Sequence, residues 1–252
     1  MKFTFCLVVV LLAMPALGVV TVSPIGDSIT NGVGSSDMGG YRIVTKQAMG
    51  SSIDFVGRLS HGSFADNQDE GWGGYTIQRV RDEVISTIPQ NGGFGQVLLL
   101  TVGSNDFIWN DHPTIDGAAA RANAALVEMQ SLLTTTYNLA PNSTVLVSSI
   151  PAIRDWFHAD NTYTYPEVDM YNEGVETLVN NFASEGRKTR FVDTMGSLDL
   201  QADFSDGVHP DDSGYAKIGA AWSNALSTVV LPEPVSTIAL APLILVARRR
   251  RR

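Results

Sequence analysis

The sequence predicts an α/β fold in which a mostly parallel sheet is covered by helices on both faces. Short apolar runs alternate with helical patterns along the chain, and runs such as "VLLLTV" are apolar at nearly every position. A continuous apolar run predicts a strand that is buried on both sides. With 252 residues, of which 44% are hydrophobic and 17% charged, the chain has the length of one such domain.

Five segments are predicted to be strands: residues 19–22, 53–56, 97–102, 144–150 and 190–192. Helices are predicted after the third and fourth strands, where apolar residues recur on one helical face: Ala118, Ala122, Ala125, Met129, Leu132 and Leu133, then Val168, Tyr171, Val175, Leu178, Val179 and Phe182. The last helix is expected to begin at Asp211 or Asp212, both good capping residues. Four of its residues are expected to face the core: Tyr215, Ile218, Trp222 and Leu226. The loops after the carboxyl ends of parallel strands then form the ligand crevice.

Residues 1–18 have the composition of a secretory signal peptide. Lys2 precedes an apolar run, residues 7–14, which is followed by Pro-Ala-Leu-Gly. We expect cleavage after Gly18 and export of the protein. The alternative, a first core strand, is disfavoured because residues 19–22 already supply that strand.

Residues 231–252 form a second terminal signal. Pro-Glu-Pro at 232–234 precedes an apolar stretch, residues 235–247, and five arginines. The stretch is short for a membrane span, but the arginines resist translocation. This order resembles the PEP-CTERM sorting signal of some Gram-negative bacteria, which implies transient membrane contact, processing by an exosortase and delivery to the cell envelope or beyond. A solvated tail and a simple membrane anchor are the alternatives, and residues 19–230 remain as the domain.

The charge and the cysteine content limit the partners and cofactors of that domain. The formal net charge is −9, and without Lys2 and the five terminal arginines it becomes about −15, which disfavours nucleic acid as a partner. The one cysteine, Cys6, lies in the signal segment, so neither disulfides nor cysteine metal sites are expected. We expect no metal and no organic cofactor.

The segment "VVTVSPIGDSITNG" leads from the first strand directly into Gly-Asp-Ser, so Ser28 lies at the crevice. A serine hydroxyl becomes a nucleophile when a histidine with its own carboxylate partner takes its proton. His61, His112 and His158 lie in polar or aromatic loops, where surface or substrate-lining roles are favoured. His209 lies in "SDGVHP" and is the candidate base.

The residues around His209 suit that role. Pro210 disfavours a helical conformation at His209 and so holds it in an extended loop before the last helix. Asp206 can bond to the imidazole Nδ1, which leaves Nε2 to face Ser28. Taken alone, the segment is equally compatible with a turn capped by Asp206 and an exposed His209.

Acyl transfer also needs hydrogen-bond donors for the oxygen that becomes negative. The loop "TVGSNDF" offers the side-chain amide of Asn105, and "EGWGGYTI" offers the backbone amides of Gly73 and Gly74. An Asx-turn and an ordinary glycine turn are the alternatives.

Taken in order, these segments resemble the blocks of the SGNH, or GDSL, hydrolase superfamily: Gly-Asp-Ser, Gly, Gly-x-Asn-Asp and Asp-x-x-His. The resemblance spans residues 22 to about 222. It implies a three-layer, flavodoxin-like fold with a five-stranded parallel sheet.

The resemblance also implies the roles of the site residues. Ser28 is the nucleophile, His209 the general base and then acid, and Asp206 the residue that orients it. The oxyanion hole consists of the backbone amides of Ser28 and Gly74 and the side chain of Asn105. A shift of one residue in the alignment would replace Gly74 by its neighbour, Gly73.

The segments "GGYRIVTKQAMGSSIDFVG" and "DNQDEGWGGYTI" are similar to the acetyl xylan esterase branch of the superfamily. In that interpretation Arg42 anchors the loop that carries the serine, although a surface arginine is an equal alternative. Asp27 and Asp106 are expected to hold loops together by hydrogen bonds. Trp72 and Gly73 stand where these relatives often carry His-Ser, which leaves the substrate preference open.

The sequence favours a secreted esterase that removes acetyl groups from carbohydrate. Four aromatic residues lie in loops near the site and either stack on sugar rings or cover the sheet edge: Trp72, Trp109, Trp156 and Phe157. No long apolar lid is evident, which disfavours a triglyceride lipase. A short-chain lipid esterase or lysophospholipase, a thioesterase and a non-enzymatic surface binding protein are the other hypotheses.

Overall fold

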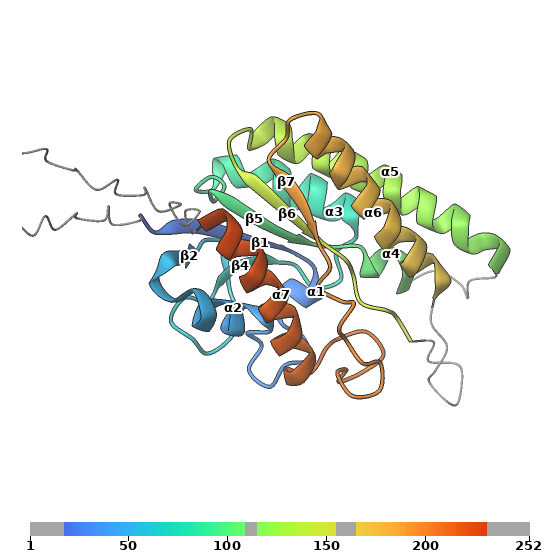
Figure 1. The fold of residues 1–252 in the computed structure, drawn as a ribbon, viewed down its shortest axis with the longest axis horizontal. Coiled ribbons are helices and arrows are strands. Elements are labelled where there is room, and N and C mark those ends of the chain that lie inside the picture. Colours follow the sequence, from blue (N-terminus) through green and yellow to red (C-terminus); the bar gives the residue numbers. More distant parts are fainter. Residues whose placement is uncertain (1–17, 109–114, 155–164, 231–252) are drawn as a thin grey trace, which may run out of the picture.

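A seven-stranded sheet runs through the protein with helices on both of its faces (Figure 1). This computed structural model describes residues 18–108, 115–154 and 165–230. The predicted terminal segments, apart from Gly18, lie outside the described residues. Within the described ranges, no helix is both long and apolar enough to cross a membrane.

All five predicted strands are present, and they pair in parallel: β1 (Val20–Gly26), β2 (Ile53–Phe55), β5 (Val97–Thr101), β6 (Thr144–Ser148) and β7 (Thr189–Val192). The order across the sheet is β3-β4-β1-β5-β6-β7, and β2 also pairs with β1. β1 continues four residues beyond its predicted end, so that Gly26 lies opposite Thr101 at the carboxyl end of β5.

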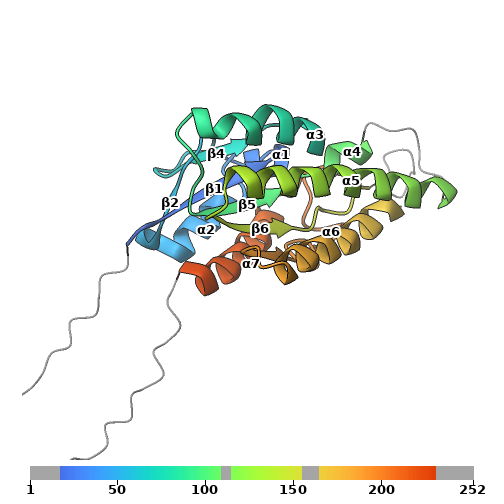
Figure 2. The same cartoon turned by 90° about the horizontal axis from the view of Figure 1, so that it is seen from above.

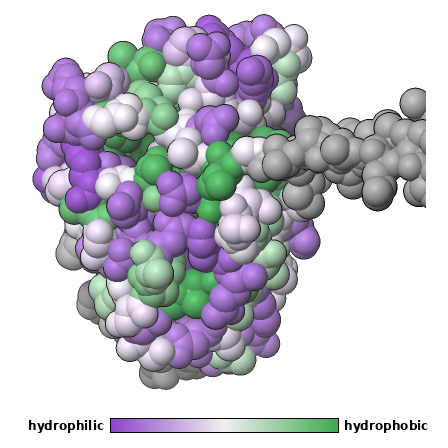
Figure 3. Space-filling view, turned by 90° about the vertical axis from the view of Figure 1, so that its left-hand side faces the viewer, coloured by the Kyte–Doolittle hydropathy of each residue, from purple (hydrophilic) through white to green (hydrophobic). Residues whose placement is uncertain are grey.

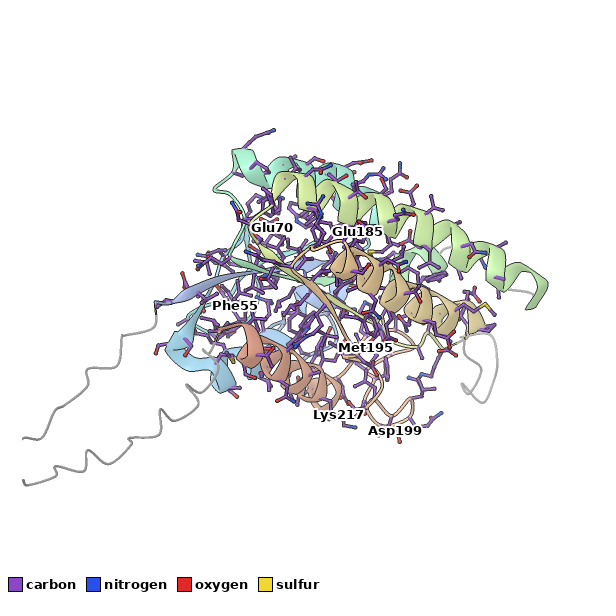
Figure 4. The ribbon with its side chains drawn as sticks, turned by 45° about the horizontal axis from the view of Figure 1, so that its top comes forward. Phe55, Glu70, Glu185, Met195, Asp199 and Lys217 are labelled. Carbon is purple, nitrogen blue, oxygen red and sulfur yellow. The ribbon has the colours of Figure 1, made fainter. Side chains whose placement is uncertain are left out.

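The predicted count of five strands was too low, because β3 (Leu59–Ser60) and β4 (Gln68–Gly71) pair antiparallel beside β1. β2 pairs with the first part of β1 and β4 with its last two residues, so two strands share one position. Phe55 of β2 and Glu70 of β4 project toward opposite faces of the sheet (Figure 4). The sequence of β4, Gln-Asp-Glu-Gly, has no apolar residue from which to predict a buried strand.

Helices cover each face of the sheet, as Figures 1 and 2 show. One face carries α3 (Ile77–Arg79), its π-helical and 3-10 continuations (Val80–Val84 and Ile85–Gln90), α5 (Ile115–Leu139) and α6 (Pro166–Ser184). The other carries α2 (Tyr41–Met49), which leads into a 3-10 turn (Gly50–Ser52), and α7 (Asp212–Val230). Leu98 and Leu100 of β5 pack on the first layer, and Val97 and Leu99 pack on the second. This alternation confirms the predicted three-layer α/β architecture.

The three predicted helices are also present. Their apolar faces are buried, except that Leu178 and Phe182 are only partly covered. α7 begins at Asp212, and Asp211 caps it: the Asp211 carboxylate accepts hydrogen bonds from the backbone N–H groups of Ser213 and Gly214.

Both ends of the described chain lie at one end of the molecule, where Val20 and Val229 border a common pocket (Figure 1). From there β1 runs to the short helix α1 (Ser28–Asn31) at the opposite end of the sheet. A second short helix, α4 (Ser104–Ile108), follows β5. The face drawn in Figure 3 has small hydrophobic patches among hydrophilic residues. Because β1 and β5 run in parallel and end beside each other, the loops that carry Ser28 and Asn105 meet at the carboxyl edge of the sheet, as predicted.

Candidate active site

Ser28 is the first residue of α1, immediately after β1. Gly26 has no room for a side chain, because a Cβ there would lie 1.9 Å from the Thr101 carbonyl oxygen. Asp27 caps α1 by accepting a hydrogen bond from the Ile29 N–H at 2.9 Å. These constraints hold Ser28 at the end of β1, with its backbone N–H in the first turn of the helix, where helical partners are absent.

Ser28 and His209 come together although 181 positions separate them in the sequence. The His209 Nε2 atom lies 3.0 Å from the Ser28 Oγ, and its Nδ1 lies 2.8 Å from the Asp206 Oδ2. The other carboxylate oxygen accepts the backbone N–H groups of Val208 and His209 at 2.7 and 2.6 Å. Burial raises the pKa of Asp206, but these hydrogen bonds outweigh it and hold the pKa below its usual value. Asp206 is therefore an ionised partner for the imidazole.

The loop that carries the pair is fixed on both sides. The Ser205 N–H donates to the His209 carbonyl at 2.9 Å, and Phe204 and Pro210 form an antiparallel bridge. Arg154, which was not among the predicted site residues, holds the same loop. Its Nη2 donates to the Asp206 carbonyl at 2.6 Å. No sequence signal marks Arg154, because the contact joins loops 52 positions apart.

The glycine segment forms a tight turn beside Ser28. The Tyr75 N–H donates to the Trp72 carbonyl at 3.1 Å, and Gly74 has a φ of +79°, a left-handed value that suits glycine at the third position of a type II turn. A Cβ at Gly73 would lie 3.9 Å from the Ser28 Cβ, so the residue before Gly74 lies close to the serine.

Asn105 lies against this turn. It is buried in α4, and its Nδ2 donates one hydrogen to the Tyr75 carbonyl at 3.0 Å. An amide nitrogen has two hydrogens, and the second has no acceptor among the described residues. The structure thus brings Asn105, the glycine turn and Ser28 to one place.

The two predicted loop-holding aspartates both accept backbone hydrogen bonds. Asp106 accepts the Ile77 N–H at 3.0 Å, which joins α4 to α3, and Asp27 accepts the Ile29 N–H. Burial raises the pKa of Asp27 to about 7 and that of Asp106 to about 6. The second carboxyl oxygen of Asp27 is buried and has no hydrogen-bond partner in the described part of the chain.

Arg42 is fully buried and is therefore not a surface arginine. Its guanidinium lies 2.9 Å from the Asp69 carboxylate. It also donates to five backbone carbonyls, of Thr30, Asn31, Met38, His61 and Asn67. Two of these carbonyls belong to α1, so Arg42 ties the helix that carries Ser28 to the neighbouring loops.

Several predicted residues have other positions. Trp72 is half-buried, and it packs against the core while its Nε1 donates to Glu70 at 3.1 Å. His112, His158, Trp109, Trp156 and Phe157 lie outside the described residues. Across residues 18–108, 115–154 and 165–230, no group of three or more metal-ligating side chains is placed to hold a metal ion.

A serine, a histidine and an aspartate in hydrogen-bond sequence at the carboxyl edge of a parallel sheet are the arrangement expected of a serine hydrolase. Residues 25–217 match the GDSL-like Lipase/Acylhydrolase family, and the chain belongs to this family. The predicted resemblance to SGNH, or GDSL, hydrolases is thereby confirmed.

Individual proteins that are similar to this chain are esterases by their printed names. The chain is 27% identical over 233 residues to a "Multidomain esterase" of Ruminococcus flavefaciens. The aligned region covers 82% of this chain but only 28% of that protein's length. Among solved structures, a Clostridium thermocellum family 3 carbohydrate esterase superposes with a TM-score of 0.69 at 26% identity, covering 84% of this chain and 98% of that one. A family 3 carbohydrate esterase from Talaromyces cellulolyticus shares the fold, with a TM-score of 0.65 at 19% identity over 84% and 98% of the two chains. These comparisons support a hydrolase that acts on ester bonds.

Proposed function

We propose that this protein is an exported serine esterase that removes short acyl groups, chiefly acetyl, from O-acetylated carbohydrate. The observation that carries the proposal is the chain of two hydrogen bonds from Ser28 Oγ through His209 to Asp206, at 3.0 and 2.8 Å. Both distances lie within the reach required for proton transfer by a general base.

In the first half of the reaction, His209 Nε2 takes the proton of the Ser28 hydroxyl as Oγ attacks the ester carbonyl carbon. The ionised Asp206 stabilises the imidazolium that forms. The tetrahedral intermediate collapses when His209 gives that proton to the sugar oxygen, which leaves as a free hydroxyl. Ser28 then carries the acetyl group as an ester.

In the second half, His209 takes a proton from water, and the hydroxide attacks the acetyl-serine. Collapse of the second intermediate returns the proton to Ser28 Oγ and releases acetic acid, which loses its proton to water and becomes acetate. The atoms balance without a metal or an organic cofactor.

The negative oxygen of each intermediate needs donors that are in place beforehand. We assign this role to the Ser28 N–H, to the second hydrogen of Asn105 Nδ2 and to the N–H of Gly74, with Gly73 as the alternative. The bond from Asn105 to the Tyr75 carbonyl supports the assignment, because it fixes the amide with one hydrogen free. Removal of one such donor typically costs about a hundredfold or more in kcat.

Carbohydrate as the substrate rests on two further observations. The similar proteins include carbohydrate esterases by their printed names. Residues 1–18 and 231–252 resemble export and sorting signals, and polymeric carbohydrate is met outside the cytoplasm. We further propose processing of the tail by an exosortase-type enzyme, which mass spectrometry of the protein from its native host would test.

Activity on acetylated xylan and on p-nitrophenyl acetate tests the proposal. Ser28→Ala is expected to lose about a thousandfold or more in kcat/KM with the fold intact. Ser184→Ala is the matched control, because Ser184 is exposed and, among the described residues, donates only to the Asn181 carbonyl of its own helix. Unchanged turnover in Ser28→Ala would reject the mechanism, whereas no turnover of either ester by the wild type would favour a non-enzymatic binding protein.

The acyl group is tested with p-nitrophenyl esters of increasing chain length and with acetyl thioesters. We expect the highest kcat/KM for the acetyl ester. A preference for chains of about eight carbons or more would instead indicate a lipid esterase. A preference for thioesters would indicate a thioesterase of the same fold.

A further inference from the structure

A second aspartate–histidine pair lies beside the helix that carries Ser28. His61 follows β3 and Asp69 lies in β4, and the imidazole Nδ1 is 3.0 Å from both carboxylate oxygens. Asp69 is fully buried, whereas the His61 side chain is 26% exposed. The mechanism proposed above uses neither residue.

The other contacts of Asp69 determine which nitrogen of His61 donates. The carboxylate lies 2.9 Å from the Arg42 guanidinium and accepts the Gly71 N–H at 2.7 Å. Burial raises the pKa of Asp69, and the positive charge of Arg42 opposes that rise. A carboxylate bonded to a guanidinium and an amide acts as an acceptor, so His61 Nδ1 is the donor. In the neutral imidazole Nε2 is then an acceptor.

That acceptor faces Asn31, the last residue of α1. The Asn31 Nδ2 lies 3.1 Å from His61 Nε2 and 3.5 Å from the Gly71 carbonyl. The Asn31 Oδ1 is buried and has no hydrogen-bond partner among the described residues. The orientation of this amide therefore depends on its two N–H donors, and the shorter contact is the one to His61.

Asn31 is also where α1 touches the segment that leads to the glycine turn. A Cβ at Gly71 would lie 2.4 Å from the Asn31 backbone nitrogen, so the two backbones are in direct contact. Ser28 lies three residues before Asn31, and the turn begins at Trp72, directly after Gly71. A movement of Asn31 would change the distance between the serine and the turn.

We propose that His61 is a positioning residue, which holds α1 against the glycine turn through Asn31 and so keeps Ser28 Oγ aligned with the oxyanion donors. Asp69 fixes the imidazole in the orientation and tautomer that this contact requires. Because misplacement of reacting groups by about 1 Å can cost about a hundredfold in rate, a modest shift of α1 has a measurable effect. The inference rests on the proposed function.

Two substitutions separate the contacts of the imidazole. His61→Asn keeps an amide near the Nδ1 position, where it can donate to Asp69, but is too short to reach Asn31. His61→Gln places an amide near the Nε2 position and gives up the contact with Asp69. We expect His61→Asn to lower kcat for p-nitrophenyl acetate about threefold to tenfold with KM within about twofold, and His61→Gln to retain at least about half of kcat.

The rate at which phenylmethylsulfonyl fluoride inactivates the enzyme provides a direct measure of Ser28 reactivity, and we expect it to fall with kcat. Asn31→Leu removes the partner of His61 and should produce a similar loss. The double variant with His61→Asn should lose no more than either single variant. Arg190→Gln is the control, because its contacts with Ala225 and Thr228 lie on α7, and its kcat should equal that of the wild type.

Wild-type kcat in His61→Asn, equal losses in both His61 variants, or additive losses in the double variant would overturn the inference. If His61→Asn does not fold, Asn31→Leu decides alone: a loss in kcat of about threefold or more supports the inference, and wild-type kcat overturns it. Ser28→Ala is assayed in parallel. Turnover that survives in Ser28→Ala defeats the proposed function itself, whereas an inactive Ser28→Ala beside an unimpaired His61→Asn defeats only the role of His61.

Discussion

Replacement of Arg42 by methionine tests how the serine helix is held. Arg42→Met keeps an unbranched apolar stem but removes the charge opposite Asp69 and the donors to five carbonyls, two of them in α1. Both partners of the ion pair are fully buried, and the loss of one partner of such a pair costs about 3–5 kcal/mol. A domain has about 5–15 kcal/mol of stability, so the variant should be folded but much weakened.

Urea unfolding at pH 7 measures this loss, and Arg42→Lys and Asp69→Asn serve as companions. Lysine keeps the charge but not the planar fork of donors, so we expect it to lose about half as much as methionine. The double variant Arg42→Met with Asp69→Asn should be more stable than Arg42→Met alone, because no unpaired charge remains buried. A loss below about 1 kcal/mol in Arg42→Met, or a double variant with fully additive losses, would refute this reasoning.

Three further substitutions test other features of the site by urea unfolding at several pH values. The raised pKa of Asp27 means that the native state keeps a proton that the unfolded chain loses between pH 3.8 and about 7. Stability should therefore fall with pH there, and Asp27→Asn should gain up to about 4 kcal/mol over the wild type by pH 7; parallel pH curves would contradict this. Hydrogen bonds from the Asp199 N–H, Lys217 and Ser213 lower the pKa of Asp203 to about 2. The advantage of the wild type over Asp203→Asn should thus be present above pH 3.8 and disappear as the pH falls to about 2; a constant difference would contradict it. Gly26→Ala should cost about 2 kcal/mol or more, because its Cβ would overlap the β5 backbone, and wild-type stability would contradict that contact.

The network around Asp203 also shows how the acid–base loop is supported. The Asp199 N–H donates to the Asp203 carboxylate at 2.6 Å, and Lys217 of α7 donates to the same oxygen at 2.5 Å. Figure 4 shows Asp199 and Lys217 on the neighbouring loop and helix. The loop that leads to His209 is thus joined by Asp203 to the first turns of α7.

The sequence was sufficient where apolar patterning determines structure. The run at 97–102 is apolar at every position except Thr101 because β5 is covered on both faces, and the spacing from Tyr215 to Leu226 matches the buried face of α7. The approach of Ser28 to His209 followed from the order of short motifs that resemble one superfamily. Neither the Gly-Asp-Ser motif nor the Asp-x-x-His motif alone predicted this contact.

The sequence was insufficient where buried polar groups compensate one another. β4 cannot be predicted from a hydrophobic pattern, because its buried residues Asp69 and Glu70 are charged and form ion pairs with Arg42 and Arg58. His61 stands in a polar loop, and only the fold brings its two neighbours within hydrogen-bond distance. Such pairings depend on residues that are far apart in the chain, so they cannot be predicted from local composition.

The most direct measurement is the site of acylation during turnover. The enzyme is mixed with an acetyl ester, quenched in acid and digested, and the peptides are analysed by mass spectrometry. We expect one acetyl group on Ser28 of the wild type and none in Ser28→Ala, and little in His209→Ala, because the same base is needed to form the acetyl-serine and to hydrolyse it. Acetylation of a different residue, or full turnover in Ser28→Ala, would contradict the proposed mechanism.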